Sequence, residues 1–187
     1  YLGLETQPHT MGYDFSEMNT DDFIALCREI GAEPFITINP CWNTPDENAA
    51  WVEYCNGDVS TPYGKLRANR GHQEPYNVQF WSLGNEFGYG HMEGDNTPAG
   101  YCQIALENGK KMLEASPGLS LCSSGPYPNK EWAEFSAKPL AGISQMISQH
   151  YYGYDPHYTD LSTVEEEYNR CMASVSRMRE LIHQSRQ

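Results

Sequence analysis

Short apolar, β-rich runs alternate with longer helix-like segments along this sequence, and no other feature constrains its fold as strongly. The strand-like runs are centred near residues 35, 80, 120 and 146, with helix-like segments before the first run and after each run. This order is typical of βα units around a parallel sheet. Four strands cannot close an eight-stranded barrel, so we predict an α/β fold that forms roughly half of a (β/α)8 TIM barrel. A small open α/β sheet is the alternative, although no Gly-rich phosphate turn follows any strand-like run.

Capping residues mark the expected helix starts. Thr44 is a predicted N-cap, Pro45 fits the first helical position and Glu47 completes a capping box. We interpret residues 1–19 as loop and residues 57–77 as a long polar connection, because both are rich in polar and turn-forming residues. Further helices are predicted to begin at Thr20, at Thr97 and, with Glu165 completing a second capping box, at Ser162.

The acidic balance of the chain argues against several classes of partner. Its 187 residues carry a formal net charge of −13, which disfavours binding to nucleic acid or to an anionic membrane surface. The one basic cluster consists of Lys65, Arg67 and Arg70, too few residues for a surface that tracks phosphates. No apolar run reaches transmembrane length. No signal peptide is visible, but the chain does not begin with Met, so a native N-terminus is not visible either.

The six cysteines and six histidines show no metal-binding spacing. There is no CxxC pair, no Cys/His cluster of the kind that holds zinc and no HExxH motif. We therefore favour reduced cysteines that pack as small apolar residues, which is typical of a cytoplasmic protein. No metal and no organic cofactor is predicted.

The stretch from Val78 to Glu86 carries the clearest candidate for chemistry. It reads as a buried strand that ends in Gly84, Asn85 and Glu86. In parallel α/β barrels the active site gathers at the carboxyl ends of the strands, where a half-buried glutamate suits general acid catalysis. Two structural alternatives stay open for Glu86: it caps the following helix, or it pairs with an arginine. For Asn85 the alternative is a local turn or cap.

Four runs of the sequence together form a specific pattern. They are Gly-Ala-Glu-Pro-Phe-Ile-Thr-Ile-Asn (31–39), Trp-Val-Glu-Tyr-Cys-Asn-Gly (51–57), Glu-Pro-Tyr-Asn-Val (74–78) and Trp-Ser-Leu-Gly-Asn-Glu (81–86). This combination closely resembles the α-L-arabinofuranosidases of glycoside hydrolase family 51, over roughly residues 20–155. Gly-Asn-Glu alone is shared by a wider clan of retaining barrel glycosidases. The resemblance implies that residues 1–187 are a fragment of a single (β/α)8 catalytic domain and hold its strands three to six.

The resemblance also implies roles for the matching positions. Glu86 would be the acid/base carboxylate, and Asn85 would hydrogen-bond the sugar hydroxyl next to the reacting carbon. His150 and Tyr152 match a His-x-Tyr pattern that lines the pocket, with Tyr152 approaching the nucleophile and the sugar. Asn39, at the end of the first strand-like run, would line the same mouth. An aromatic cluster that packs under a loop is the alternative for His150 and Tyr152.

Three aromatic residues have two possible fates. Trp42, Phe87 and Tyr89 lie in predicted loops near these positions, where their rings either stack on a sugar face or pack against the protein. Strand alternation predicts that Tyr151 points away from the side that carries its two neighbours.

A retaining glycosidase also needs a second carboxylate about 5 Å from the first. The resemblance places that nucleophile on strand seven, beyond the last strand-like run here. The later carboxylates lie in a loop or in the last helix: they are Asp155, Asp160, Glu165, Glu166, Glu167 and Glu180. We therefore expect the nucleophile outside this chain, and the 187 residues alone to be inactive.

The resemblance implies retaining hydrolysis of terminal non-reducing α-L-arabinofuranosyl residues of arabinan or arabinoxylan, with the parent protein as a possible homo-oligomer. Two other functions stay open. One is a retaining barrel glycosidase for xylosides or glucans, which would share Asn85 and Glu86. The other is a carbohydrate-binding barrel without catalytic activity. An intact Asn-Glu pair argues against the latter.

Overall fold

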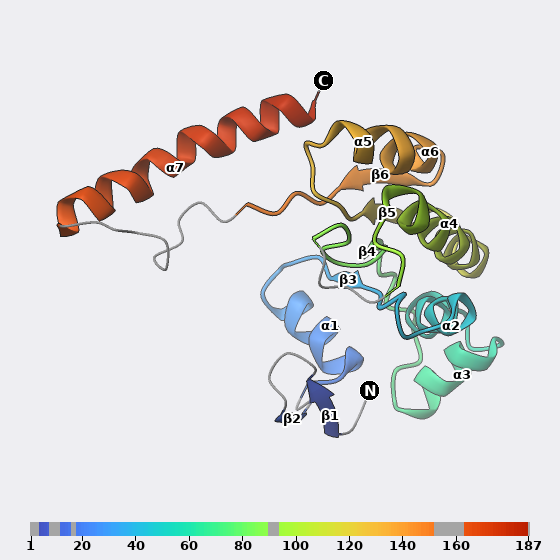
Figure 1. Cartoon of the computed structure of the whole chain (residues 1–187). Coiled ribbons are helices and arrows are strands. Elements are labelled where there is room, and N and C mark those ends of the chain that lie inside the picture. The colour runs from blue at the N-terminus through green and yellow to red at the C-terminus, as the bar shows by residue number, and fades with distance from the viewer. Residues whose placement is uncertain (1–3, 8–11, 16–17, 90–93, 152–162, 187) are drawn as a thin grey trace.

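The computed structural model describes residues 4–7, 12–15, 18–89, 94–151 and 163–186. Among these residues, four strands form the central sheet in sequence order, and every neighbouring pair is parallel (Figure 1). The α/β class and the four predicted strand positions are confirmed. The strands are β3 (Phe35–Thr37), β4 (Phe80–Ser82), β5 (Ser120–Ser123) and β6 (Ser144–Ile147).

Helices follow or precede each of these strands. The first three are α1 (Thr20–Glu29), α2 (Pro45–Asn56) and α3 (Pro62–Asn69), and the longest one between strands is α4 (Pro98–Ala115). The short helical segments α5 (Lys130–Trp132), η1 (Ala133–Ala137) and α6 (Lys138–Leu140) follow one another directly, and α7 (Val164–Ser185) is the last helix.

The core lies between the sheet and helices α2 and α4. Ile36, Trp81 and Leu121 are partners in the strand register and are all buried. They belong to one apolar cluster with residues of both helices, such as Val52 and Met112. Burying each such side chain contributes about 1.5–3 kcal/mol. This packing fixes the strand ends, which is what positions the candidate site.

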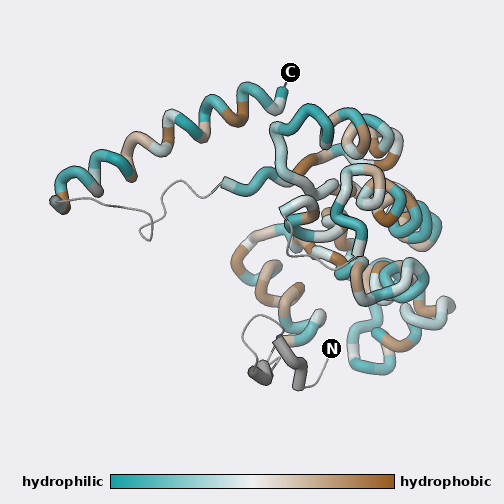
Figure 2. The backbone as a smooth tube through the Cα atoms, in the orientation of Figure 1, coloured by the Kyte–Doolittle hydropathy of each residue, from teal (hydrophilic) through white to brown (hydrophobic). Residues whose placement is uncertain are grey.

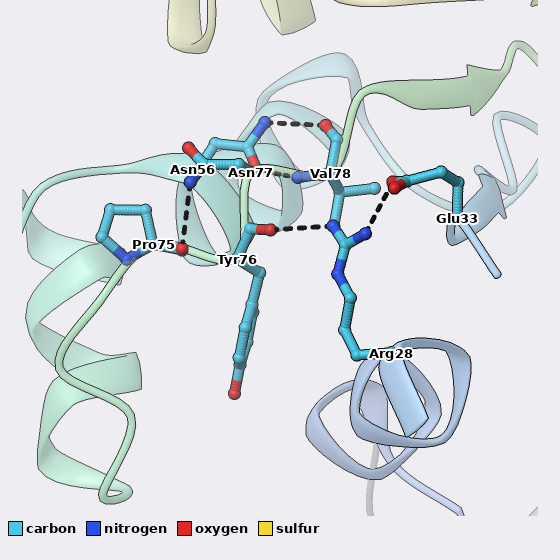
Figure 3. Close-up of polar contacts among 7 residues, drawn as sticks. All are labelled: Arg28, Glu33, Asn56, Pro75, Tyr76, Asn77 and Val78. Carbon is cyan, nitrogen blue, oxygen red and sulfur yellow. Dashed lines mark hydrogen bonds and ion pairs between the residues drawn. The ribbon is translucent and has the colours of Figure 1, made fainter. Parts of the chain in front are cut away.

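The side chain of Asn56 holds the backbone of Val78, two residues before β4 begins. Its amide donates to the carbonyl of Val78 at 2.9 Å, and its carbonyl oxygen accepts the Val78 N–H at 2.7 Å. Figure 3 shows this pair beside Arg28, which donates to the carbonyl of Tyr76 at 3.3 Å and pairs with Glu33 at 2.7 Å. The asparagine of the Trp-Val-Glu-Tyr-Cys-Asn-Gly run thus holds the valine of the Glu-Pro-Tyr-Asn-Val run.

The prediction of a long connection over residues 57–77 is wrong, because α3 lies within it. Thr61 caps this helix and Pro62 begins it, the same Thr-Pro start that marks α2 and α4. Arg67 does not belong to an exposed basic cluster: its side chain is fully buried. The guanidinium donates to the carbonyls of Tyr54, Gly57, His72 and Gln73.

The prediction of loop over residues 1–19 is also wrong in part. Strands β1 (Leu4–Gln7) and β2 (Gly12–Phe15) pair antiparallel there. Both segments, Leu-Glu-Thr-Gln and Gly-Tyr-Asp-Phe, lack Val and Ile and contain polar or turn-forming residues, so neither stands out as a strand in the sequence. Two helix starts shift by one residue, since Asn19 rather than Thr20 caps α1, and Thr163 rather than Ser162 caps α7. The capping box of Thr44 and Glu47 is confirmed.

Helix α7 stands apart from the helices that cover the sheet (Figure 1). Apolar residues recur among hydrophilic ones along its length (Figure 2), and they are exposed. None of the described helices has the length and apolar character required to cross a membrane. The exposed apolar residues of α7 are Val164, Tyr168, Met172, Val175, Met178 and Ile182, at the spacing of a single helix face.

Candidate active site

The chain makes a tight turn directly after β4, and Glu86 lies in it. Gly84 has φ 105° and Glu86 has φ 53°, so both residues occupy the left-handed region. Only glycine adopts this region readily, and a glutamate there costs about 1–3 kcal/mol. A Cβ on Gly84 would lie 2.5 Å from Cε2 of Phe87. The Gly-Asn-Glu sequence therefore fits a turn that another residue in place of Gly84 would disturb.

Phe87 anchors this turn in the core. Its side chain is fully buried, and its ring centroid lies 4.7 Å from that of Tyr101 on α4. Of the two possible fates, Phe87 thus packs against the protein. Tyr89 and Trp42 are exposed, and the Tyr89 ring centroid lies 6.2 Å from that of His150.

His150 meets Glu86 at the carboxyl ends of the strands. Nδ1 of the imidazole lies 2.8 Å from Oε1 of Glu86, and the two side chains are 26% and 18% exposed. His150 follows β6, whose end is held to β5 by the Ser148 N–H donating to the Ser123 carbonyl at 2.8 Å. The adjacent Tyr151 contacts α7 instead, since its hydroxyl donates to the Ser174 carbonyl at 3.1 Å. The strand order brings together Glu86 and His150, two predicted site residues that are far apart in sequence.

The other predicted site residues do not take part in the contact between Glu86 and His150. Asn39 lies two residues beyond β3 and Asn85 lies beside Glu86, so both occupy the same edge of the sheet, with exposed side chains. Tyr152 lies outside the described residues. Sequence reasoning missed two buried serines, Ser123 at the end of β5 and Ser124 directly after it, and Ser124 bonds the turn.

Other parts of the described chain offer less chemistry. A cavity of about 360 Å³ runs along the outer edge of β3, and one of about 290 Å³ lies between α2 and α3. Neither is lined by Glu86 or His150. No group of three His, Cys, Asp or Glu side chains gathers as metal ligands within the described residues. All six cysteines fall in those residues and are free thiols.

Fold and site together define a class of protein. Parallel βα units carry a partly buried carboxylate in contact with an imidazole, at the strand ends where α/β barrel enzymes place their active sites. The family model described as Alpha-L-arabinofuranosidase 1 domain matches residues 4–170. The chain belongs to this family.

Relatives support the same assignment. The chain is 34% identical over 128 residues to alpha-L-arabinofuranosidase C of Emericella nidulans. The matched region covers 68% of this chain and 25% of that protein. The chain is 30% identical over 144 residues to the intracellular exo-alpha-(1->5)-L-arabinofuranosidase of Halalkalibacterium halodurans, covering 74% and 29%. The chain thus spans between a quarter and a third of the length of these curated relatives.

Solved structures share the fold. The Thermotoga maritima alpha-L-arabinofuranosidase in complex with arabinose is 34% identical, with a TM-score of 0.75 over 98% of this chain and 38% of that chain. The family 51 alpha-L-arabinofuranosidase of Bifidobacterium longum reaches a TM-score of 0.84 at 22% identity, over 98% and 37%. The latter likeness concerns the fold alone.

Proposed function

We propose that this chain is part of an exo-acting glycosidase that releases terminal non-reducing α-L-arabinofuranosyl residues from arabinan or arabinoxylan oligosaccharides with retention of configuration. The observation that carries the proposal is the contact between Glu86 and His150 at the strand ends of a chain that belongs to an α-L-arabinofuranosidase family. The relatives named for this activity support the substrate class.

In this proposal Glu86 acts twice. It first protonates the glycosidic oxygen as the bond to the anomeric carbon breaks and a carboxylate nucleophile attacks that carbon. Deprotonated Glu86 then takes a proton from water as the water releases the sugar. The imidazole of His150 hydrogen-bonds Oε1 of Glu86 and so fixes the plane of the carboxyl group. Asn85 hydrogen-bonds the hydroxyl beside the anomeric carbon, and Asn39 and Tyr152 line the mouth.

The second carboxylate is proposed to lie outside these 187 residues, on strand seven of a (β/α)8 barrel whose strands three to six are β3 to β6. Three observations support this architecture. The relatives are three to four times longer than their match to this chain. All-parallel sheets occur with both faces covered, yet Phe35 on β3 is 48% exposed. The apolar face of α7 is exposed as well, as expected where further parts of a protein pack.

The same proposal includes two properties of the whole protein. A cytoplasmic location is supported by the free cysteines and by the relative named as intracellular. A homo-oligomeric parent follows from the family resemblance. The parent acts on arabinose-containing oligosaccharide or polysaccharide, without nucleic acid or membrane as a partner.

The test uses the full-length protein that contains this chain and a panel of aryl glycosides. We expect selective cleavage of the α-L-arabinofuranoside and a loss of activity in Glu86→Ala. Azide should restore that variant with a product of retained configuration, because azide attacks the intermediate without a base. The exposed Glu134, which pairs with Lys138, supplies the matched control Glu134→Ala. Full activity in Glu86→Ala contradicts the proposal, and cleavage of xylosides or glucosides instead would reassign the substrate.

A further inference from the structure

A tyrosine hydroxyl interrupts the hydrogen-bond ladder between β4 and β5 just before the turn that carries Glu86. Bonds between these strands run regularly up to that point: the Ser120 N–H donates to the Gln79 carbonyl at 2.9 Å, and the Leu83 N–H to the Cys122 carbonyl at 2.8 Å. Parallel ladders are evenly spaced, so the next bond would join the Ser124 N–H to the Leu83 carbonyl.

The hydroxyl of Tyr101 takes the place of that bond. It accepts the Ser124 N–H at 2.6 Å and donates to the Leu83 carbonyl at 3.1 Å. Just beyond the ends of β4 and β5, one oxygen atom therefore stands between the two backbone groups, and both groups keep a partner. Leu83 is the third residue before Glu86, so the separation sets where the turn starts.

The backbone that follows Glu86 is held by the side chain of the same Ser124. Oγ of Ser124 accepts the N–H of Phe87 at 3.3 Å, and Phe87 directly follows Glu86. Tyr101 and Ser124 are both fully buried. The backbone on either side of Glu86 is thus fixed by two hydroxyl groups, one from α4 and one from the residue directly after β5.

Two aromatic neighbours pack against the buried ring of Tyr101. The Phe87 ring lies 4.7 Å away between centroids, and the Trp132 ring lies 5.7 Å away in a stacked arrangement. Trp132 itself donates from Nε1 to the Ser124 carbonyl at 3.1 Å. Burial raises the pKa of Tyr101, so the hydroxyl stays protonated and can donate.

We propose that Tyr101 and Ser124 are positioning residues for Glu86, which hold its left-handed backbone so that the carboxyl group meets the leaving oxygen. This inference rests on the acid/base role of Glu86 in the proposed function. Neither hydroxyl touches the substrate. Each acts through the backbone of the turn, and a displacement of about 1 Å at a reacting group can cost about 100-fold in rate.

The test compares two leaving groups in the full-length protein. Tyr101→Phe keeps the ring and removes the bridging oxygen. For a phenyl α-L-arabinofuranoside, whose departure needs a proton, kcat/KM should fall by about 10- to 100-fold. For the 2,4-dinitrophenyl α-L-arabinofuranoside it should fall by less than about threefold, because that phenolate departs with little protonation. Ser124→Ala should shift the same ratio in the same direction.

A purely structural role would lower both rates equally, because it would only reduce the amount of native enzyme. Equal losses, or no loss, in both Tyr101→Phe and Ser124→Ala overturn the inference. If Tyr101→Phe does not fold, Ser124→Ala decides alone. Tyr54→Phe is the matched control, since Tyr54 is a buried tyrosine that bonds Asp21 away from the turn. Glu86→Ala, assayed with the same pair, tests the proposed function separately: a leaving-group-dependent loss there supports it whatever Tyr101→Phe does.

Discussion

Nδ1 of His150 lies 2.8 Å from Oε1 of Glu86, although the two residues are 64 positions apart in the sequence. They follow β6 and β4, which both flank β5, so the strands that carry them are two spacings, or about 10 Å, apart. The two side chains bridge that gap across the end of β5. One proton suffices for the contact, because either the imidazole N–H donates to a carboxylate or a carboxyl group donates to the neutral ring.

His150→Phe should impair catalysis more than folding. A ring of similar size fills the space but offers no partner to Oε1 of Glu86, so the carboxyl group loses a fixed orientation. We expect kcat/KM on an aryl α-L-arabinofuranoside to fall by about 10-fold or more in the full-length protein. The adjacent Tyr151→Phe is the control, since that hydroxyl bonds the Ser174 carbonyl of α7 instead. Equal losses in the two variants would contradict a specific role for His150.

Gly84→Ala should damage the same turn from its backbone. A Cβ there would lie 2.5 Å from the ring of Phe87, in addition to the cost of a positive φ. Gly118 has a similar φ of 90° with nothing within 4 Å of a Cβ, so Gly118→Ala isolates the backbone cost of about 1–3 kcal/mol. We expect urea unfolding to show losses in both variants, but only Gly84→Ala to lose activity as well. An active Gly84→Ala would mean that the turn tolerates displacement.

Much of the fold could be predicted because local signals and tertiary packing agree. The Thr44–Pro45 start of α2 is visible in sequence and confirmed, and so are the four strands. Helix α3 has the same Thr-Pro start, but it is short and mostly polar, so its sequence was interpreted as part of a connection. A charged residue such as Arg67 is expected at the surface, but four backbone carbonyls in and after α2 and α3 bind its buried guanidinium.

The candidate site was predictable only in part, for a physical reason. Glu86 was located by the strand-like run that it ends, and His150 by the His-x-Tyr pattern of the family resemblance. Tyr101 and Ser124 belong to no motif: one reads as an inward-facing helix residue, the other as a residue after a strand. Their hydroxyls matter because β4, β5 and α4 converge, and a sequence pattern carries no record of which backbone groups lack a direct ladder partner.

Arg67→Met should destabilise the protein strongly. The guanidinium is fully buried and donates to four backbone carbonyls, which would all lose a charged donor. We expect the free energy of unfolding to fall by about 3 kcal/mol or more. Lys65 lies on the same helix and is exposed, so Lys65→Met should change it by less than about 0.5 kcal/mol. Similar denaturation midpoints for the two variants would contradict the buried position of Arg67.

Tyr54 should make the protein lose stability at alkaline pH. Its hydroxyl donates to both oxygens of Asp21, at 2.7 and 2.9 Å, and burial, followed by the bond and charge of Asp21, raises the pKa of Tyr54 from 10.0 to about 12. The fold therefore favours the protonated phenol. This contribution is fully present below pH 10 and is lost as the pH rises from 10 through 12, because the unfolded chain ionises first.

Chemical denaturation at pH 8, 10 and 11 checks this sign. The wild-type free energy of unfolding should fall across the upper interval, whereas Tyr54→Phe should begin lower and fall less steeply. Tyr76 also donates to Asp21, at 2.9 Å, and burial raises its pKa in the same direction, so the variant retains part of the slope. Tyr63→Phe, at an exposed tyrosine of α3, should leave the slope as in the wild type. Parallel curves for the wild type and Tyr54→Phe would show that Asp21 does not hold the Tyr54 hydroxyl in solution.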